Sequence, residues 1–224
     1  MKVVLFVCLL LVTGSVFAQK NMLGTNLKVY DPLSGFSKNI GALPAGLSMN
    51  YLRSFENNKF SVGAEIGVAM YSSNTYTIDY KGETLEVSEE DCFWTAHATI
   101  RYDVIRTDNF ITYAEVKVGV TTFFSSIDAF DTETDYQGEF SFHGTAFNTG
   151  LGGGIMIKPS YIFSQPDKPG RVWLNVGAIL NSGSNTDYRY MPKGESGINT
   201  SLADGQYESL THYVGYKFGV LFQF

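Results

Sequence analysis

The chain has 224 residues, a formal net charge of −6, 23 glycines and 15% aromatic residues. The acid excess argues against a nucleic-acid partner, and two cysteines and three histidines are too few to suggest a zinc site. Abundant glycine and aromatic residues with few charges are typical of a chain whose polar side chains face inward and whose apolar side chains face outward.

The N-terminal segment reads as an export signal. Lys2 provides the positive start, residues 3–12 form an unbroken apolar run, and residues 16–18 offer a cleavage site before Gln19. Ten apolar residues are too few to span a bilayer as a helix, and no later stretch approaches the roughly 18 that are needed. We therefore predict a signal peptide over residues 1–18, and a single domain over 19–224 that crosses the bacterial outer membrane as strands.

The rest of the chain alternates between apolar and polar side chains in segments long enough to be membrane strands. Eight such segments are expected, at about 21–30, 46–55, 60–71, 92–105, 110–124, 145–157, 171–181 and 209–224. The links between them are alternately long and short. Long loops outside and short turns in the periplasm are typical of an outer-membrane barrel, and with both termini in the periplasm all four long links fall outside.

Charged side chains recur on the polar face of these segments, which would line the lumen. Glu65, Arg101 and Glu115 fall at similar depth when counted from their periplasmic turns, and Lys117 and Lys217 share the same face. An eight-stranded barrel has room only for side chains, so we predict a ladder of ion pairs that plugs the lumen. The alternative is a narrow ion-conducting pore, in which the same pairs exchange partners and act as a gate.

The long links carry most of the acidic residues and a set of aromatic residues. Segments 75–80 and 84–88 resemble the two arms of a hairpin, and 136–143 extends the sixth strand outward. An extended sheet with open edges could add a strand from a surface protein, or could simply be a longer sheet. The candidate interaction surface consists of Tyr76, Tyr80, Tyr136, Phe140 and Phe142. The acidic rim could also hold divalent cations that bridge to lipopolysaccharide, or could only keep the loops solvated.

The sequence contains no recognisable catalytic motif. His143 is followed by Gly144 and Thr145 rather than by a serine nucleophile, and His212 has no acid on its own strand face. The glycine run at 150–154 lacks the ending of a phosphate-binding loop. We predict no catalytic residue, cofactor or metal, and a lipid A-modifying membrane enzyme remains an alternative.

Taken together, the export signal, the eight alternating segments, the link pattern and the final Phe224 resemble the superfamily of small outer-membrane β-barrels, which includes OmpA-like, OmpX-like and opacity-type proteins. The resemblance implies an all-β, eight-stranded antiparallel up-and-down transmembrane barrel. It also implies that Phe222 and Phe224 act as an insertion signal for the barrel insertion machinery. The resemblance does not select among the roles of this superfamily. From the residues we expect a non-enzymatic barrel whose outer loops bind a partner or support outer-membrane integrity, with outer-membrane lipid, lipopolysaccharide and a surface protein as partners.

Overall fold

The computed structural model describes residues 20–40, 43–55, 59–80, 83–130, 137–159, 172–189 and 206–224. The predicted signal peptide, residues 1–18, lies outside these described residues. No helix in the described part is long and apolar enough to cross a membrane. Eight strands form the barrel: β1 (Lys20–Pro32), β2 (Ala45–Ser54), β3 (Phe60–Tyr80), β4 (Glu83–Arg106), β5 (Phe110–Phe130), β6 (Gln137–Ile157), β7 (Val172–Gly183) and β10 (Tyr213–Gln223).

These eight strands close on themselves, as the sequence predicted. The order around the ring is β1-β10-β7-β6-β5-β4-β3-β2, and every neighbouring pair is antiparallel. At the seam, the Asn21 amide donates to the Phe224 carbonyl oxygen at 3.0 Å, and the Phe224 amide donates back at 2.9 Å. Closure gives each strand two hydrogen-bonding neighbours, which is the condition for strands to stand in hydrocarbon.

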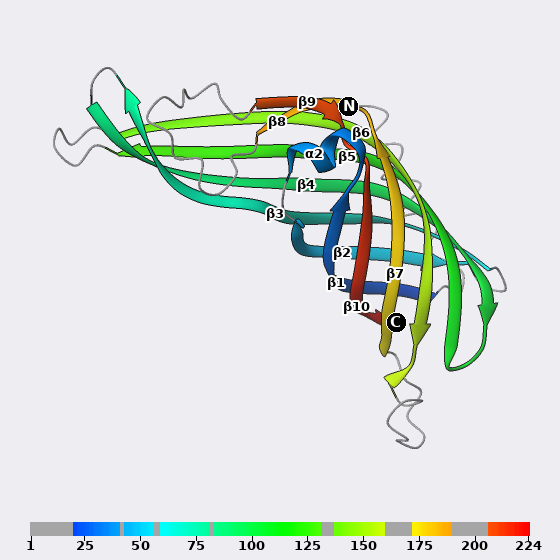
Figure 1. The fold of residues 1–224 in the computed structure, drawn as a ribbon. Coiled ribbons are helices and arrows are strands. Elements are labelled where there is room, and N and C mark those ends of the chain that lie inside the picture. Colours follow the sequence, from blue (N-terminus) through cyan, green and yellow to red (C-terminus); the bar gives the residue numbers. More distant parts are fainter. Residues whose placement is uncertain are drawn as a thin grey trace, which may run out of the picture.

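Four of the strands continue past the rest of the ring. β3, β4, β5 and β6 project as a curved sheet beyond the shorter strands (Figure 1). The predicted hairpin is confirmed, since Thr75 pairs with Ser88 and Tyr80 with Glu83. β2 pairs with β3 only as far as Met70, so the projecting part of β3 has β4 as its hydrogen-bonded neighbour on one side only. We call this four-stranded projection the outer extension.

Three short elements in the long links were not predicted. They are α2 (Ser34–Asn39), β8 (Asn185–Arg189) and β9 (Gln206–Leu210), and β8 and β9 pair as a separate two-stranded sheet. The expected strand at 209–224 is therefore wrong at its start, because β9 ends before Thr211 and β10 begins after His212. A Cβ atom at Gly144 in β6 would clash with the Asp187 carbonyl oxygen, so glycine is required there for β8 to pack against the sheet.

The outward face of the ring is apolar and bounded by two rings of aromatic residues. Trp94 and Phe147 are 55% and 56% exposed near the outer side, and Phe60 and Phe222 are 46% and 52% exposed near the periplasmic side. This is the arrangement expected where lipid covers the strands and aromatic rings lie at the headgroups. Trp173 points inward and is 4% exposed.

The interior is filled by three layers. Aromatic residues pack at the outer mouth, where Phe36 of α2 contacts Phe123 and Tyr188 with ring centroids 5.6 and 5.1 Å apart. Charged and amide side chains fill the centre. Apolar side chains pack at the periplasmic mouth: Met22, Leu52, Ile111, Tyr113, Met156, Trp173 and Leu221.

Candidate functional site

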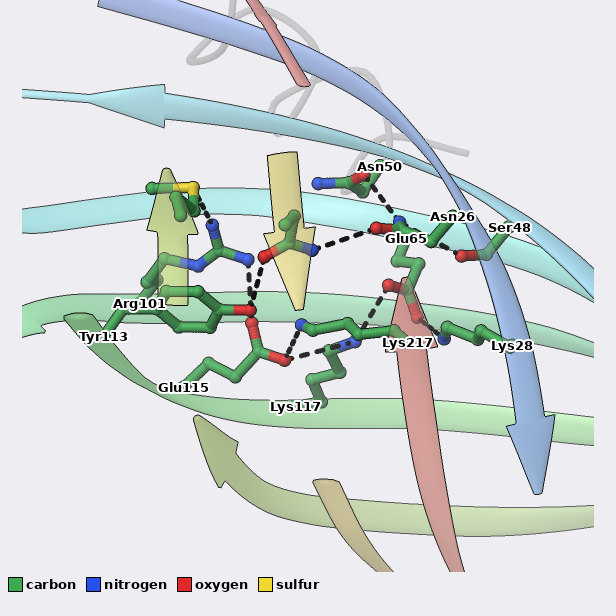
Figure 2. A network of polar contacts seen from close by, with 12 residues as sticks. Asn26, Lys28, Ser48, Asn50, Glu65, Arg101, Tyr113, Glu115, Lys117 and Lys217 are labelled. Atoms are coloured by element: carbon green, nitrogen blue, oxygen red, sulfur yellow. Dashed lines mark hydrogen bonds and ion pairs between the residues drawn. The ribbon is translucent and has the colours of Figure 1, made fainter. Parts of the chain in front are cut away.

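The central layer contains six charged side chains that contact one another across the lumen (Figure 2). We call them the lumen network; each is at most 4% exposed, and they come from β1, β3, β4, β5 and β10. Side chains alternate between the two faces of a strand, so these positions all face inward. This is why the sequence could identify them. The members are Lys28, Glu65, Arg101, Glu115, Lys117 and Lys217.

Glu115 is the most shared acceptor of the lumen network. Its Oε2 accepts from Arg101 Nη2 at 2.9 Å, its Oε1 forms an ion pair with Lys217, and Lys117 Nζ lies 3.6 Å from the same Oε1. The Arg101 guanidinium also stacks 3.8 Å from the centroid of the Tyr113 ring. One carboxylate thus joins three cations from three strands.

Glu65 forms the other half of the lumen network. It pairs with Lys28 of β1 and, at 2.9 Å, with Lys117 of β5. The expectation that Glu65 and Arg101 lie at one level is wrong, because Glu65 is opposite His97 in the ladder and Arg101 is opposite Ser61. Counting from periplasmic turns works for β4 and β5, which share such a turn. It fails between β3 and β4, because strand tilt in a closed barrel staggers them.

Amide and hydroxyl side chains complete the central layer, and sequence reasoning missed them. Asn26 Nδ2 donates to Asn50 Oδ1 at 3.0 Å, and Asn175 Nδ2 donates to Asn26 Oδ1 at 3.0 Å. His97 Nε2 and Asn148 Oδ1 are 2.7 Å apart. Asparagine at inward positions of several strands was the signal that could have revealed this layer. These bonds satisfy polar groups that would otherwise be buried at a cost.

Glycines make room for the long side chains of this layer. A Cβ atom at Gly177 would lie 2.8 Å from Lys217 Cε and 2.7 Å from the Tyr113 hydroxyl oxygen. Substitution there would displace a lumen network lysine. Glycine at this inward position therefore makes room for a charged side chain of the lumen network.

A second buried ion pair lies in the outer extension. Arg189 of β8 donates from Nε to Glu89 Oε1 of β4 at 2.6 Å, and both side chains are at most 1% exposed. Tyr76 donates its hydroxyl to Glu89 Oε2 at 2.7 Å. The pair joins the β8–β9 hairpin to the wall of the extension, and a pocket of about 350 Å³ opens between hairpin and wall.

This geometry corrects part of the predicted interaction surface. Tyr76 is 7% exposed and turned toward Glu89, so its ring is not presented on the outside. Phe142 is partly buried against the apolar cluster of the extension. Tyr136 and the side chains of Tyr80 and Phe140 lie outside the described part of the chain.

Asp91 and Tyr76 of the outer extension have raised pKa values because they are buried beyond the outer aromatic ring. Burial raises the pKa of Asp91 to about 7, with the nearby Glu89 carboxylate adding to the shift. Burial also raises the pKa of Tyr76 to about 12. Both groups thus favour their neutral forms more than they would in water.

Within the part of the chain that the structure describes, no hydrogen bond or ion pair joins the side chain of His143 or His212 to an acid or to a hydroxyl nucleophile. His143 is exposed on the outward side of β6 together with Thr145, whose Oγ1 lies 3.2 Å from Thr122 Oγ1. His212 lies between β9 and β10, where its carbonyl oxygen accepts from the Leu33 amide at 2.8 Å. Among the described residues, no group of three or more His, Cys, Asp or Glu side chains could hold a metal ion.

The closed ring, the apolar outward face and the asymmetry of short turns and long loops define a transmembrane β-barrel of the bacterial outer membrane. No protein-family model matches the chain, and no curated protein matches its sequence. Solved structures of outer-membrane proteins do resemble it over most of its length.

Three of them illustrate the likeness. Ail, the attachment invasion locus protein of Yersinia pestis, solved with the heparin analogue sucrose octasulfate, is 10% identical with a TM-score of 0.46, covering 92% of this chain and 97% of Ail. Neisserial surface protein A is 13% identical with a TM-score of 0.45, over 91% and 97% of the two chains. A major outer membrane protein from Thermus thermophilus is 14% identical with a TM-score of 0.46, over 93% and 100%.

Proposed function

We propose that this barrel is a non-enzymatic protein of the outer membrane, closed to ions, whose outer extension binds a partner at the cell surface. The observation that carries the first part is the filling of the lumen. The lumen network lies between an aromatic layer and an apolar layer, and its six members are at most 4% exposed. Side-chain packing of this kind leaves the interior of an eight-stranded barrel without a water path.

Single-channel recording in planar bilayers tests the closed lumen against the pore alternative. The barrel should be silent, and Glu65→Ala should at most add brief, irregular openings as Lys28 and Lys117 lose their carboxylate. Glu86→Ala, on the exposed face of the extension, is the matched control and should be silent as well. Steady conductance of the unmodified barrel that Glu65→Ala alters would favour a gated pore instead.

The outer extension supports the second part of the proposal. Its β3 edge beyond Met70 has no β2 residue paired with it, and unpaired strand edges accept a further strand from another protein. The exposed carboxylates of Glu86 and Glu90 on β4 would disfavour a polyanionic partner.

Photo-crosslinking in living cells tests this surface. A crosslinker at the exposed Ser73 should capture a defined protein, and one at Trp94 in the lipid-facing ring should not. Removing residues 76–87, which keeps Ser73 and leaves Thr75 and Ser88 as the turn beyond the Asn74–Glu89 pair, should abolish capture from Ser73 while the barrel still folds. A product that persists after this deletion would place the partner elsewhere.

Phe222 and Phe224 are proposed to engage the barrel insertion machinery. They are 52% and 61% exposed on the lipid side of the seam strand. Phe224→Ser should slow assembly in cells while leaving refolding in detergent unchanged. Equal assembly rates would contradict this role.

A further inference from the structure

A second pocket lies at the opposite end of the barrel from the outer extension. It has a volume of about 330 Å³. It is formed by the starts of β1, β5 and β7, the turn after β4, and the C-terminal ends of β6 and β10. Because the lining includes the inward-facing Met22, Ile111 and Trp173, the pocket opens from the lumen mouth into the periplasm rather than toward the bilayer.

Three cations from three separate elements converge on this pocket. They are Lys20, Arg106 and Lys158, and Asp108 is the single acidic residue among the described residues of the lining. The whole chain has a net charge of −6, so the positive charge at this mouth is opposite in sign to the charge of the protein as a whole. A concave site lined by one sign of charge concentrates ligands of the opposite sign.

The three cations differ in what already holds them. Arg106 forms an ion pair with Asp103, whose side chain is 1% exposed, so it is committed to the barrel. Among the described residues, neither Lys20 nor Lys158 forms an ion pair. Lys158 Nζ instead lies 5.1 Å from the centroid of the Trp173 ring, which keeps its charge above the pocket floor.

The floor itself is fixed in place. Trp173 is 4% exposed, and its indole Nε1 donates to Gln223 Oε1 at 3.2 Å. Met22 and Ile111 line the pocket beside Trp173 and belong to the same apolar layer at this end of the lumen. A ligand could therefore enter the pocket but would not pass through the barrel.

We propose that this periplasmic pocket is a binding site for a phosphate group, held by the ammonium groups of Lys20 and Lys158 above the Trp173 indole. Lysine ammonium groups bind phosphate as point charges, and the indole offers an apolar face to the organic part of the ligand. The phosphate could belong to a soluble periplasmic phosphate ester or to the headgroup of an inner-leaflet lipid. The orientation of the pocket favours the soluble source.

Tryptophan fluorescence gives a direct test, because the chain has only two tryptophans. In a Trp94→Phe background, Trp173 is the single indole and reports on the pocket alone. The full-length processed barrel, refolded in a zwitterionic detergent, is titrated with inorganic phosphate and pyrophosphate. Saturable change of Trp173 emission that weakens at high salt is the expected result.

Matched lysine variants identify the site. Lys20→Gln and Lys158→Gln should each weaken pyrophosphate binding by about two- to fivefold, the scale of an exposed ion pair. Lys59→Gln is the control, since Lys59 is exposed at the same end but lies near the Tyr102 ring outside the pocket. Equal weakening in all three variants would overturn the proposal, because it would reflect general charge attraction.

A second arm separates the two sources of phosphate. The barrel is placed in nanodiscs of phosphatidylglycerol or of phosphatidylcholine, and Trp173 emission is compared. A difference between the lipids that Lys158→Gln removes and Lys59→Gln keeps would assign the site to a lipid headgroup. No response to pyrophosphate and none to the anionic lipid would refute the phosphate site.

Discussion

Two buried charge clusters in this barrel use the same chemistry in different ways. In the lumen network, Glu115 serves three cations and Glu65 serves two, and Lys117 contacts both carboxylates, so the six members form one network that spans five strands. In the outer extension, Arg189 and Glu89 join one hairpin to one wall. The first cluster therefore supports the ring as a whole, and the second fixes the position of a single lid-like element.

The difference follows from geometry. Strands on opposite sides of a narrow ring bring side chains together at the axis, where carboxylates must be shared because there is little water. At the mouth, the β8–β9 hairpin approaches from one side only. Removing a charge should thus have a global effect in the lumen network and a local effect at the mouth.

The largest effect is expected for Glu115→Leu. It leaves Arg101, Lys117 and Lys217 without their common acceptor, and breaking a buried pair in this way costs about 3–5 kcal/mol of the free energy of unfolding. Urea unfolding of the detergent-refolded barrel measures the loss. A loss no greater than that of the exposed control Glu86→Gln would show that the lumen network does not hold the ring together.

A smaller global effect is expected for Glu65→Gln. Lys28 loses its carboxylate, but Lys117 keeps Glu115 at 3.6 Å, so the loss should be about 2–3 kcal/mol. The same unfolding experiment applies. If Glu65→Gln equalled Glu115→Leu, sharing of carboxylates would not determine stability.

Arg189→Met should act on the mouth alone. It leaves Glu89 buried without its cation, a local cost of about 1–3 kcal/mol. Amide hydrogen exchange should become faster in β8 and β9. It should stay unchanged in the part of β5 on the periplasmic side of Phe123. Faster exchange throughout the ring would remove the distinction between the two clusters.

The last prediction concerns the loss of a proton rather than of a side chain. The pKa of Asp91 is raised to about 7 by burial, above its ordinary value of about 4, so the folded chain holds a proton that the unfolded chain releases. Stability should fall as pH rises from about 4 to about 7, by at most about 1.4 kcal/mol per pH unit, and level off above that. Asp91→Asn should flatten this slope in urea unfolding measured between about pH 4 and 8. An unchanged slope would assign it to another group.

Much of the ring could be read from the sequence because membrane strands obey a local rule. Alternation along one strand separates lipid-facing from lumen-facing side chains, so Phe218 and Lys217 could be assigned to opposite faces before any partner was known. Arg101 and Glu115 could also be brought together, since a short turn links their strands. Both assignments rest on neighbours in the sequence.

Other features depend on elements that are far apart in the chain. The inward turn of Tyr76 depends on Arg189, which arrives on β8 more than a hundred residues later. α2 is six residues long and carries little helical pattern, and the aromatic residues around Phe36 are what hold it. Short segments of this kind are defined by packing rather than by their own propensity.

The sequence alone determined that eight alternating strands present an apolar face to lipid and a charged face to the lumen, because alternation is a property of single strands. Only the tertiary structure decided which charges meet, since Glu65 takes Lys28 and Lys117 rather than Arg101. The physical reason is the stagger imposed by closing the ring, which sets the level of each strand against strands that the sequence does not place beside it.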